Sequence, residues 1–173
     1  MSEGIQPKIV SAFPCLGKSY YAKTHPKLAL DLESSSYLFD RTGYEDMDPE
    51  EFKGLPDRIP NPNGLDDYVT AIVDAVKSEQ YRYIFISQNP EVIKALIKLG
   101  YTIWMVVPSN TEGSRRAFIQ RALDRGNSTT WMQKVIKFIG RSLEEDYSSE
   151  EIKKIRRTII SDGLYLSDVV GLL

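Results

Sequence analysis

Short apolar runs that suit β-strands alternate along this chain with segments whose apolar residues recur at helical spacing. Such alternation is typical of a sheet whose strands are joined by helices rather than by hairpins. The predicted strands are Lys8–Phe13, Leu28–Leu32, Tyr83–Ser87, Tyr101–Val107 and Thr158–Ser161. The predicted helices are Gly17–Lys23, Leu65–Ser78, Asn89–Leu99, Thr111–Arg125, Thr129–Arg141, Ser148–Arg157 and Leu166–Leu172. The sequence therefore predicts an α/β fold, a three-layer α/β/α sandwich around five parallel strands.

The length of 173 residues fits one compact domain, so residues 1–173 are expected to fold as a single unit. In parallel sheets of this kind, ligands bind just beyond the carboxyl ends of the strands. The residues that directly follow each strand are therefore the first candidates for function.

Composition excludes several kinds of site. With 22 Lys and Arg against 24 Asp and Glu, the formal charge is −2, which argues against nucleic acid as a partner. Cys15 and His25 are the only residues of their types, so an internal disulfide and a Cys/His zinc site are excluded. The N-terminus does not resemble a signal peptide and no apolar run approaches membrane-spanning length. We expect a cytoplasmic protein that has no membrane partner.

The loop after the first strand reads AFPCLGKS, from Ala12 to Ser19. It matches the phosphate-binding pattern G-x-x-x-x-G-K-S/T, except that Ala12 replaces the first glycine. In that pattern backbone N–H groups surround a β-phosphate, the lysine reaches the β and γ oxygens, and the hydroxyl binds magnesium. The residues predicted to bind a nucleotide here are Phe13, Pro14, Cys15, Leu16, Gly17, Lys18, Ser19 and Tyr20.

A purely structural reading of this loop stays open. Gly17 would then form a turn, with Lys18 and Ser19 at a solvated helix start. A lysine at a helix start opposes the positive end of the helix dipole unless an anion is bound there, which favours the phosphate reading. Cys15 is expected to fill space rather than to act as a nucleophile, because nothing nearby supplies its general base.

On these residues the chain resembles compact P-loop kinases that phosphorylate small molecules, among them nucleoside monophosphate kinases, shikimate kinase and gluconate kinase. The resemblance is carried by AFPCLGKS, by DLESSSY from Asp31, by ISQNPEV from Ile86, and by an arginine-rich helix that ends in RGN. The ending YLSDVV resembles the short nucleotide kinases of bacteriophages and some bacteria. The resemblance implies the strand order 2-3-1-4-5 and the ligands ATP and Mg²⁺.

The resemblance places an acidic residue after the second strand, where it organises magnesium or takes the proton of the acceptor. By position this role falls to Asp31, with Glu33 as a second carboxylate, and Ser19 and Asp31 become the predicted metal ligands. Alternatively, the stretch around Glu33 and Ser35 only starts a helix. The strand that precedes Ser87 lacks the carboxylate that many P-loop enzymes have there. Ser87 and Gln88 could orient the γ-phosphate, or only cap the next helix.

Two further segments complete the predicted site. A helical lid at about 111–141 is expected to bring arginines to the phosphates, with Arg121 and Arg125 as catalytic residues and Arg116 as a nucleotide ligand. A solvated helix with scattered charge is the alternative for each arginine. The proline-rich insertion at about 40–63 is expected to bind the acceptor. The residues predicted for the acceptor are Asp31, Glu33, Ser35, Arg41, Arg58, Ser87 and Gln88, with Tyr37, Phe39 or Tyr44 as stacking candidates.

The sequence thus favours an ATP-dependent kinase for a small acceptor, best a nucleoside or deoxynucleoside monophosphate. Two alternatives remain: a nucleotide-binding module that has lost catalysis, and a kinase for nucleic-acid ends or modified bases in DNA. A homodimer is left open, and a phage-encoded protein would act in the host cytoplasm.

Overall fold

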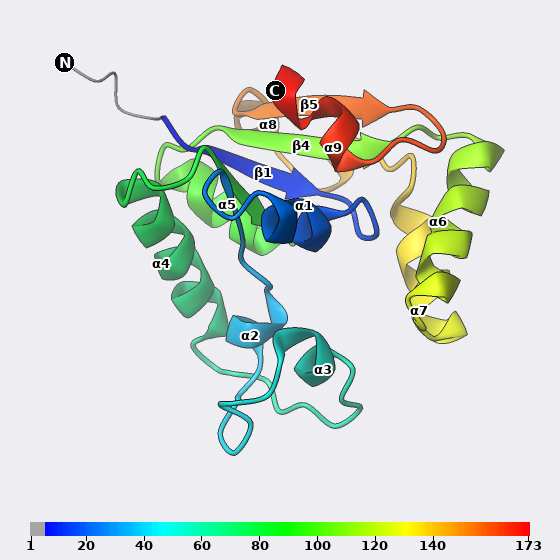
Figure 1. Ribbon diagram of the computed structural model, residues 1–173. Coiled ribbons are helices and arrows are strands. Elements are labelled where there is room, and N and C mark those ends of the chain that lie inside the picture. Colours follow the sequence, from blue (N-terminus) through cyan, green and yellow to red (C-terminus); the bar gives the residue numbers. More distant parts are fainter. Residues whose placement is uncertain (1–5) are drawn as a thin grey trace.

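The computed structural model describes residues 6–173 and confirms the predicted α/β fold. All five strands are parallel, in the order β2-β3-β1-β4-β5 (Figure 1). They are β1 (Lys8–Ala12), β2 (Ala29–Asp31), β3 (Tyr83–Ile86), β4 (Ile103–Pro108) and β5 (Ile155–Ile160). Because the strands share one direction, their carboxyl ends meet at a single edge of the sheet.

Side chains alternate between the two faces of the sheet, as the period of a strand requires. On β4, Ile103 and Met105 belong to one core cluster, whereas Trp104 and Val106 belong to the other. Ile103 and Val106 are fully buried, and each such side chain contributes about 1.5–3 kcal/mol of burial free energy. The sheet is therefore covered on both faces, which agrees with the apolar runs in the sequence.

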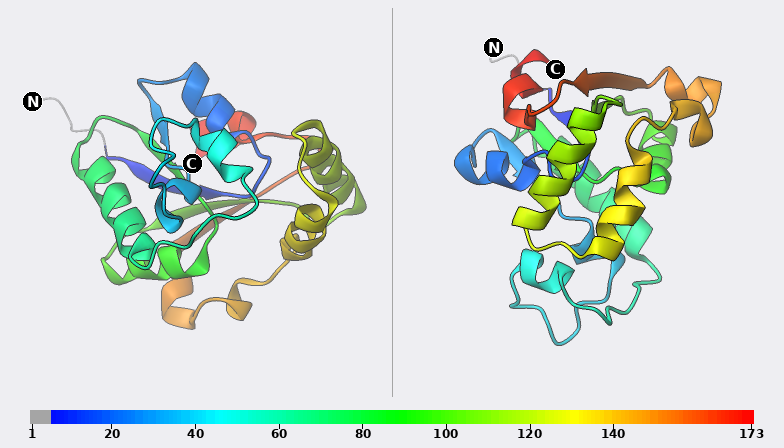
Figure 2. Two further views of the ribbon diagram at one scale, coloured as in Figure 1. Left: turned by 90° about the horizontal axis from the view of Figure 1, so that it is seen from below. Right: turned by 90° about the vertical axis from the view of Figure 1, so that its right-hand side faces the viewer.

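Two helices, α4 (Gly64–Lys77) and α5 (Pro90–Lys98), pack together on one face of the sheet. The helices that supply buried residues to the other face are α1 (Lys18–Thr24), α6 (Glu112–Asp124), α7 (Thr129–Val135) and α9 (Leu166–Val169). Figure 2 shows α6 and α7 running side by side at the end of the molecule toward which the strands point. These two helices form the predicted lid segment.

The insertion contains a short helix, α3 (Pro49–Lys53), and follows another, α2 (Ser35–Leu38). A single antiparallel bridge between Phe39 and Pro60 closes the intervening chain into a loop. Figure 1 shows this loop hanging from the same end of the molecule that carries α2. Ser35 is the first residue of α2, so it lies at a helix start, as the structural alternative expects.

Three predicted boundaries were wrong. The helix predicted to run to Arg157 is only α8 (Ser149–Ile152), and β5 begins at Ile155 rather than at Thr158. β5 is an edge strand, so Arg156 and Arg157 reach solvent while their backbone pairs with β4. The helix predicted to reach Arg141 ends as α7 at Val135 and continues as a 3₁₀ turn, Ile136–Phe138.

Two further 3₁₀ turns, Leu143–Glu145 and Val170–Leu172, complete the elements of residues 6–173. Within that range no helix combines the length and apolar character needed to cross a bilayer.

Candidate active site

The loop from Ala12 to Ser19 curls beyond the carboxyl end of β1. The Phe13 N–H donates to the carbonyl of Val106 over 2.9 Å, which fixes the start of the loop against β4. Cys15 and Gly17 both have left-handed backbones, with φ of 63° and 91°. Alternation of right- and left-handed residues turns successive N–H groups toward a common centre, the arrangement that binds phosphate.

The loop divides its side chains between the core and the surface of a cleft. Phe13 and Leu16 are buried in the core, 2% and 3% exposed, so only their backbone can contribute to ligand binding. The other predicted loop residues line the cleft: Pro14, Cys15, Gly17, Lys18, Ser19 and Tyr20. Tyr20 is 71% exposed at its rim.

Lys18 folds back over the loop. Its Nζ donates a 2.8 Å hydrogen bond to the carbonyl oxygen of Ala12. Burial lowers the pKa of the Lys18 ammonium; the charge of Asp31 raises it, and the positive charges of Lys53 and Arg125 lower it further. The charge of Glu33, like that of Asp31, also favours the ammonium form of Lys18. The one hydrogen bond that Lys18 makes among the described residues, to Ala12, leaves N–H donors for an anionic ligand.

Asp31 ends β2 directly opposite the start of α1. Ser19 Oγ donates a 2.6 Å hydrogen bond to Oδ2 of Asp31. Burial raises the pKa of the Asp31 carboxyl, while the hydrogen bond from Ser19 and the charge of Lys18 oppose that rise. The predicted pair of metal ligands is therefore adjacent.

A hydroxyl and a carboxylate suit Mg²⁺, which prefers oxygen ligands and usually takes only one or two from the protein, the rest coming from phosphates and water. Within residues 6–173 no three His, Cys, Asp or Glu side chains gather as a protein-only metal cage. The donor set fits a magnesium ion that arrives with a nucleotide.

Glu33 lies two residues beyond β2 and pairs with a lysine from the insertion. Lys53 Nζ donates to Oε2 of Glu33 over 2.9 Å, and the backbone and hydroxyl of Ser35 donate to Oε1. Burial raises the pKa of the Glu33 carboxyl, but Lys53 and Ser35 outweigh burial and leave it below its usual range. Glu33 is therefore an ionised group with a structural cation partner.

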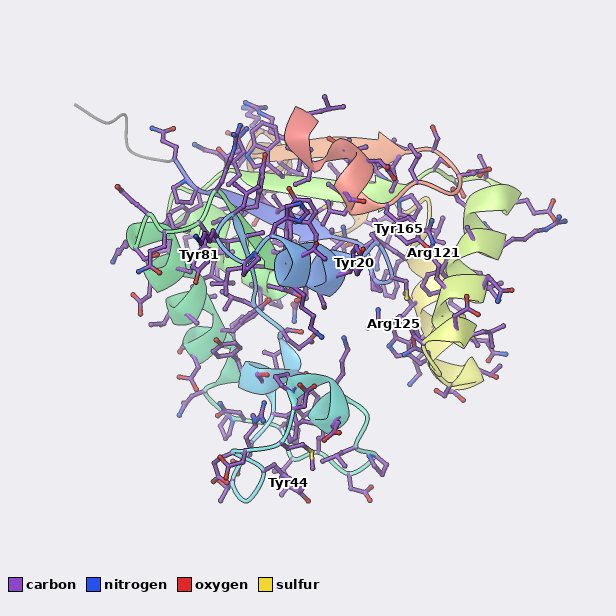
Figure 3. The ribbon with its side chains drawn as sticks, viewed as in Figure 1. Tyr20, Tyr44, Tyr81, Arg121, Arg125 and Tyr165 are labelled. Atoms are coloured by element: carbon purple, nitrogen blue, oxygen red, sulfur yellow. The ribbon has the colours of Figure 1, made fainter. Side chains whose placement is uncertain are left out.

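The lid arginines reach the opposite side of the loop. The Arg121 guanidinium lies 3.8 Å over the Tyr165 ring and donates to the carbonyl of Leu164. Arg125 Nη1 donates to Cys15 Sγ over 3.7 Å. Figure 3 shows Arg121 and Tyr165 next to one another between the loop and α6, with Arg125 on the same side. Two of the predicted arginines thus converge on the loop.

These residues line one cleft of about 600 Å³. The five cations that line it are Lys18, Lys23, Lys53, Arg121 and Arg125, and the three carboxylates are Asp31, Glu33 and Asp124. A chain with a net charge of −2 has thus gathered an excess of positive charge at its cleft. Such a surface concentrates anionic ligands.

The structure does not bring every predicted residue to the cleft. Arg116 forms an exposed ion pair with Glu112 on the outer side of α6. Arg41 donates to the carbonyls of Tyr44 and Met47, and Arg58 lies 4.0 Å over the ring of Phe39. These three arginines do not line the cleft.

The aromatic residues considered for stacking also have other contacts. Tyr37 stacks on Tyr68, at 5.2 Å between ring centroids, and Tyr44 packs against Phe52. In Figure 3, Tyr44 lies at the far end of the insertion, away from Arg121 and Arg125. Neither Tyr37 nor Tyr44 lines the cleft, and neither is fully buried.

Ser87 and Gln88 do line the cleft, but the amide of Gln88 is engaged by the sheet. Its Nε2 donates to the carbonyls of Ser11 and Val106, at 3.3 and 3.2 Å. The Ser87 N–H donates to the hydroxyl of Tyr68, which in turn donates to the carbonyl of Leu32. This tyrosine joins the ends of β2 and β3 and so fixes where Asp31 lies.

Sequence reasoning missed several lining residues: Lys23, Leu32, Ser34, Lys53, Asp124, Asn127, Trp131 and Tyr165. Tyr165 lies within the YLSDVV segment, which marked the resemblance without indicating a role. The ring of Tyr165 would lie 3.6 Å from a side chain placed at Gly17, so it forms part of the wall behind the loop. Nothing in the spacing of the insertion singles out Lys53.

No protein-family model and no curated protein matches this chain in sequence. Solved structures do resemble it. The tunicamycin resistance protein of Deinococcus radiodurans has a TM-score of 0.54 at 15% identity, over 96% of this chain and 92% of that one. A gluconokinase from Sinorhizobium meliloti 1021 has a TM-score of 0.51 at 13% identity, over 96% and 89%. At these identities the likeness shows the shared fold.

Proposed function

We propose that this protein transfers the γ-phosphoryl group of ATP to a small acceptor. One observation carries the proposal. Lys18 and the Ser19–Asp31 pair converge beyond the carboxyl ends of β1 and β2, on a cleft with excess positive charge. Phosphoryl transfer requires alignment, a metal and cations around the γ-phosphate, and little covalent chemistry from the protein. The fold shared with a gluconokinase is consistent with this activity.

The residues would divide the work as follows. The loop N–H groups and Lys18 would hold the donor phosphates, and Ser19 and Asp31 would hold a Mg²⁺ ion, whose charge would neutralise part of that of the phosphates. Arg121 and Arg125 move from Tyr165 and Cys15 onto the γ-phosphate as it leaves ADP. The acceptor oxygen forms the new P–O bond as the bond to the ADP oxygen breaks. A monophosphate attacks with an ionised phosphate oxygen, whereas a hydroxyl acceptor would pass its proton to Asp31 or to water.

Asp31 suits that proton better than Glu33. Burial raises the pKa of Asp31, whereas Lys53 and Ser35 keep the pKa of Glu33 low. Asp31 would keep this basicity only if it holds Mg²⁺ through a water molecule, because direct contact with the cation would lower its pKa. Glu33 instead would orient the acceptor. A nucleoside or deoxynucleoside monophosphate is the acceptor that we favour, because the cleft offers more cations than the donor alone requires.

A second candidate is a module that binds ATP without catalysis. Ala12 replaces the first loop glycine, and β3 is followed by Ser87 and Gln88 rather than by a carboxylate. The amide of Gln88 is bound to two strand carbonyls. Of the three carboxylates among the described residues that line the cleft, Asp31 is the one hydrogen-bonded to Ser19. This candidate predicts tight ATP binding and no product.

The test is a radiolabel transfer assay. The protein is incubated with γ-³²P-ATP, Mg²⁺ and a panel of nucleoside and deoxynucleoside monophosphates, nucleosides, sugars and sugar acids, with oligonucleotides as a separate arm. Labelled product that disappears in Lys18→Met but persists in Lys94→Met supports the proposal, since Lys94 forms an ion pair on α5 outside the cleft. Equal background in the wild type and Lys18→Met would overturn it.

A further inference from the structure

The insertion presents one cation to the cleft. Of its three cationic residues, Arg41 and Arg58 are engaged by backbone carbonyls and by an aromatic ring, as described above. Lys53, from α3, is the lining residue that the described part of segment 40–63 contributes. A cationic contact between the insertion and a ligand in the cleft therefore has to come from Lys53.

Lys53 faces the same space as the donor-binding cations. Lys53 and Arg125 both act on the ammonium of Lys18 through their like charge, so these three groups lie within electrostatic reach of one another. Asp31 and Glu33 offset part of the repulsion among these cations, and an anion that enters the cleft would relieve the rest. Lys18 belongs to the loop and Arg125 to the lid that contacts the loop at Cys15, and both would hold the donor. Lys53 instead comes from the insertion and pairs with Glu33.

The ammonium of Lys53 also has donors to spare. It carries three N–H donors, and the hydrogen bonds among the described residues give its side chain one partner, Glu33. Glu33 keeps two bonds from Ser35 without it. Lys53 can therefore turn toward a ligand without leaving the Glu33 carboxylate unpartnered, and at 33% side-chain exposure it remains accessible from the cleft.

We propose that Lys53 binds an anionic group of the acceptor, a phosphate, and so selects phosphorylated acceptors over their unphosphorylated counterparts. Lys53 takes the role that the sequence assigned to Arg41 and Arg58. Glu33 holds Lys53 in place while the cleft is empty. When Lys53 binds the acceptor phosphate, Glu33 accepts a hydrogen bond from a hydroxyl elsewhere on the acceptor, such as one on its sugar. This inference rests on the phosphoryl-transfer function proposed above.

Matched acceptor pairs test the inference, each a nucleoside 5′-monophosphate and its nucleoside. In Lys53→Met we expect the KM for the monophosphate to rise about 10- to 100-fold, the loss typical of a charged hydrogen-bonding partner. The KM for ATP should stay within about twofold, and so should the dissociation constant of the nucleoside measured by calorimetry, since the nucleoside lacks the phosphate that Lys53 contacts. Lys53→Arg, which keeps the charge, should restore most of the monophosphate affinity, and Lys94→Met serves as the control.

Three results would overturn the inference: an unchanged KM for the monophosphate, an equal loss for the monophosphate and the nucleoside, or a wild type that neither binds nor phosphorylates any monophosphate. Calorimetry with monophosphates, on protein saturated with a non-hydrolysable ATP analogue, separates this failure from that of the proposed function. If monophosphates bind in a way that depends on Lys53 but are not phosphorylated, the kinase function is refuted and the phosphate site at Lys53 is supported. If Lys53→Met phosphorylates monophosphates as well as the wild type does, the kinase function stands and the phosphate site at Lys53 is refuted.

Discussion

Ser19 Oγ and Asp31 Oδ2 lie 2.6 Å apart and join the first residues of α1 to the last residue of β2. The two residues are twelve positions apart in the sequence, and only the parallel packing of β1, β3 and β2 brings them together. This pair is where the proposed metal, donor phosphates and acceptor would meet.

Asp31→Asn is expected to lower kcat by about 100-fold or more, the loss typical of a group that stabilises developing charge. The same variant should unfold at higher urea concentration than the wild type at pH 7. The pKa of Asp31 is raised by burial, so its contribution to stability is present below the unfolded pKa and is lost as pH rises through the folded pKa. In Asp31→Asn the neutral amide avoids the free-energy cost of burying an ionised carboxylate at pH 7.

Steady-state kinetics measure the expected fall in kcat, and urea titrations measure the expected gain in stability, both in Asp31→Asn. Asp74→Asn, on the exposed side of α4, is the control. A loss of activity together with a loss of stability would mean that Asp31 is a structural residue.

The affinity for ATP is expected to fall at high pH earlier than for a protein with an ordinary lysine. Burial lowers the pKa of Lys18 in the free protein, and bound phosphate raises it again. Binding is therefore strongest below the pKa of free Lys18 and weakens as pH rises from there toward the pKa of the complex. The dissociation constant, measured from pH 7 to pH 10, should lose this dependence in Lys18→Arg. A flat profile in the wild type would count against a buried ammonium on the phosphates.

Cys15 has a left-handed backbone, a conformation that costs a residue with a side chain about 1–2 kcal/mol. Cys15→Gly relieves this strain, which stabilises the protein, but also removes a buried side chain, which destabilises it. Because the two effects oppose each other, the free energy of unfolding should change by less than about 1 kcal/mol. In Cys15→Val the branched side chain should lower stability by about 2 kcal/mol or more. Urea denaturation gives both values, and a valine variant more stable than the glycine variant would refute this account of the loop.

The contact between Arg121 and Tyr165 should be present only while the cleft is empty. A double-mutant cycle with Arg121→Ala and Tyr165→Ala is expected to give a coupling energy of about 0.5–1 kcal/mol in thermal unfolding without nucleotide. With saturating MgATP the coupling should vanish, because Arg121 is then on the phosphates. A coupling energy that MgATP leaves unchanged would show that Arg121 belongs to the wall of the cleft and not to a lid.

The fold could be predicted from the sequence because its information is local and periodic. Runs such as Tyr83–Ile86 are apolar on both faces, which suits strands covered by helices on both sides. The edge strand β5 was misjudged for the same reason: Arg156 and Arg157 face solvent and gave it a helical charge pattern. Whether a strand lies at the edge of a sheet depends on how all the strands are arranged, so the six residues of β5 alone do not reveal it.

The site could be predicted only where function is carried by backbone geometry. The loop at Ala12 to Ser19 has a fixed spacing, and Asp31 follows from its position after a strand. Lys53 could not be found in this way, because its contact with Glu33 depends on how a loop of about twenty residues folds back. Arg41 and Arg58 were preferred to it by residue type, and the loop uses them for its own carbonyls and rings.

Titration calorimetry with MgATP shows whether the loop at Ala12 to Ser19 binds a polyphosphate. We expect one site per chain in the wild type and in Lys94→Met, with affinity reduced by about 30-fold or more in Lys18→Met through loss of a charge-assisted contact. We also expect weaker binding when Mg²⁺ is removed. No heat of binding in the wild type, or the same affinity in Lys18→Met, would contradict polyphosphate binding by this loop.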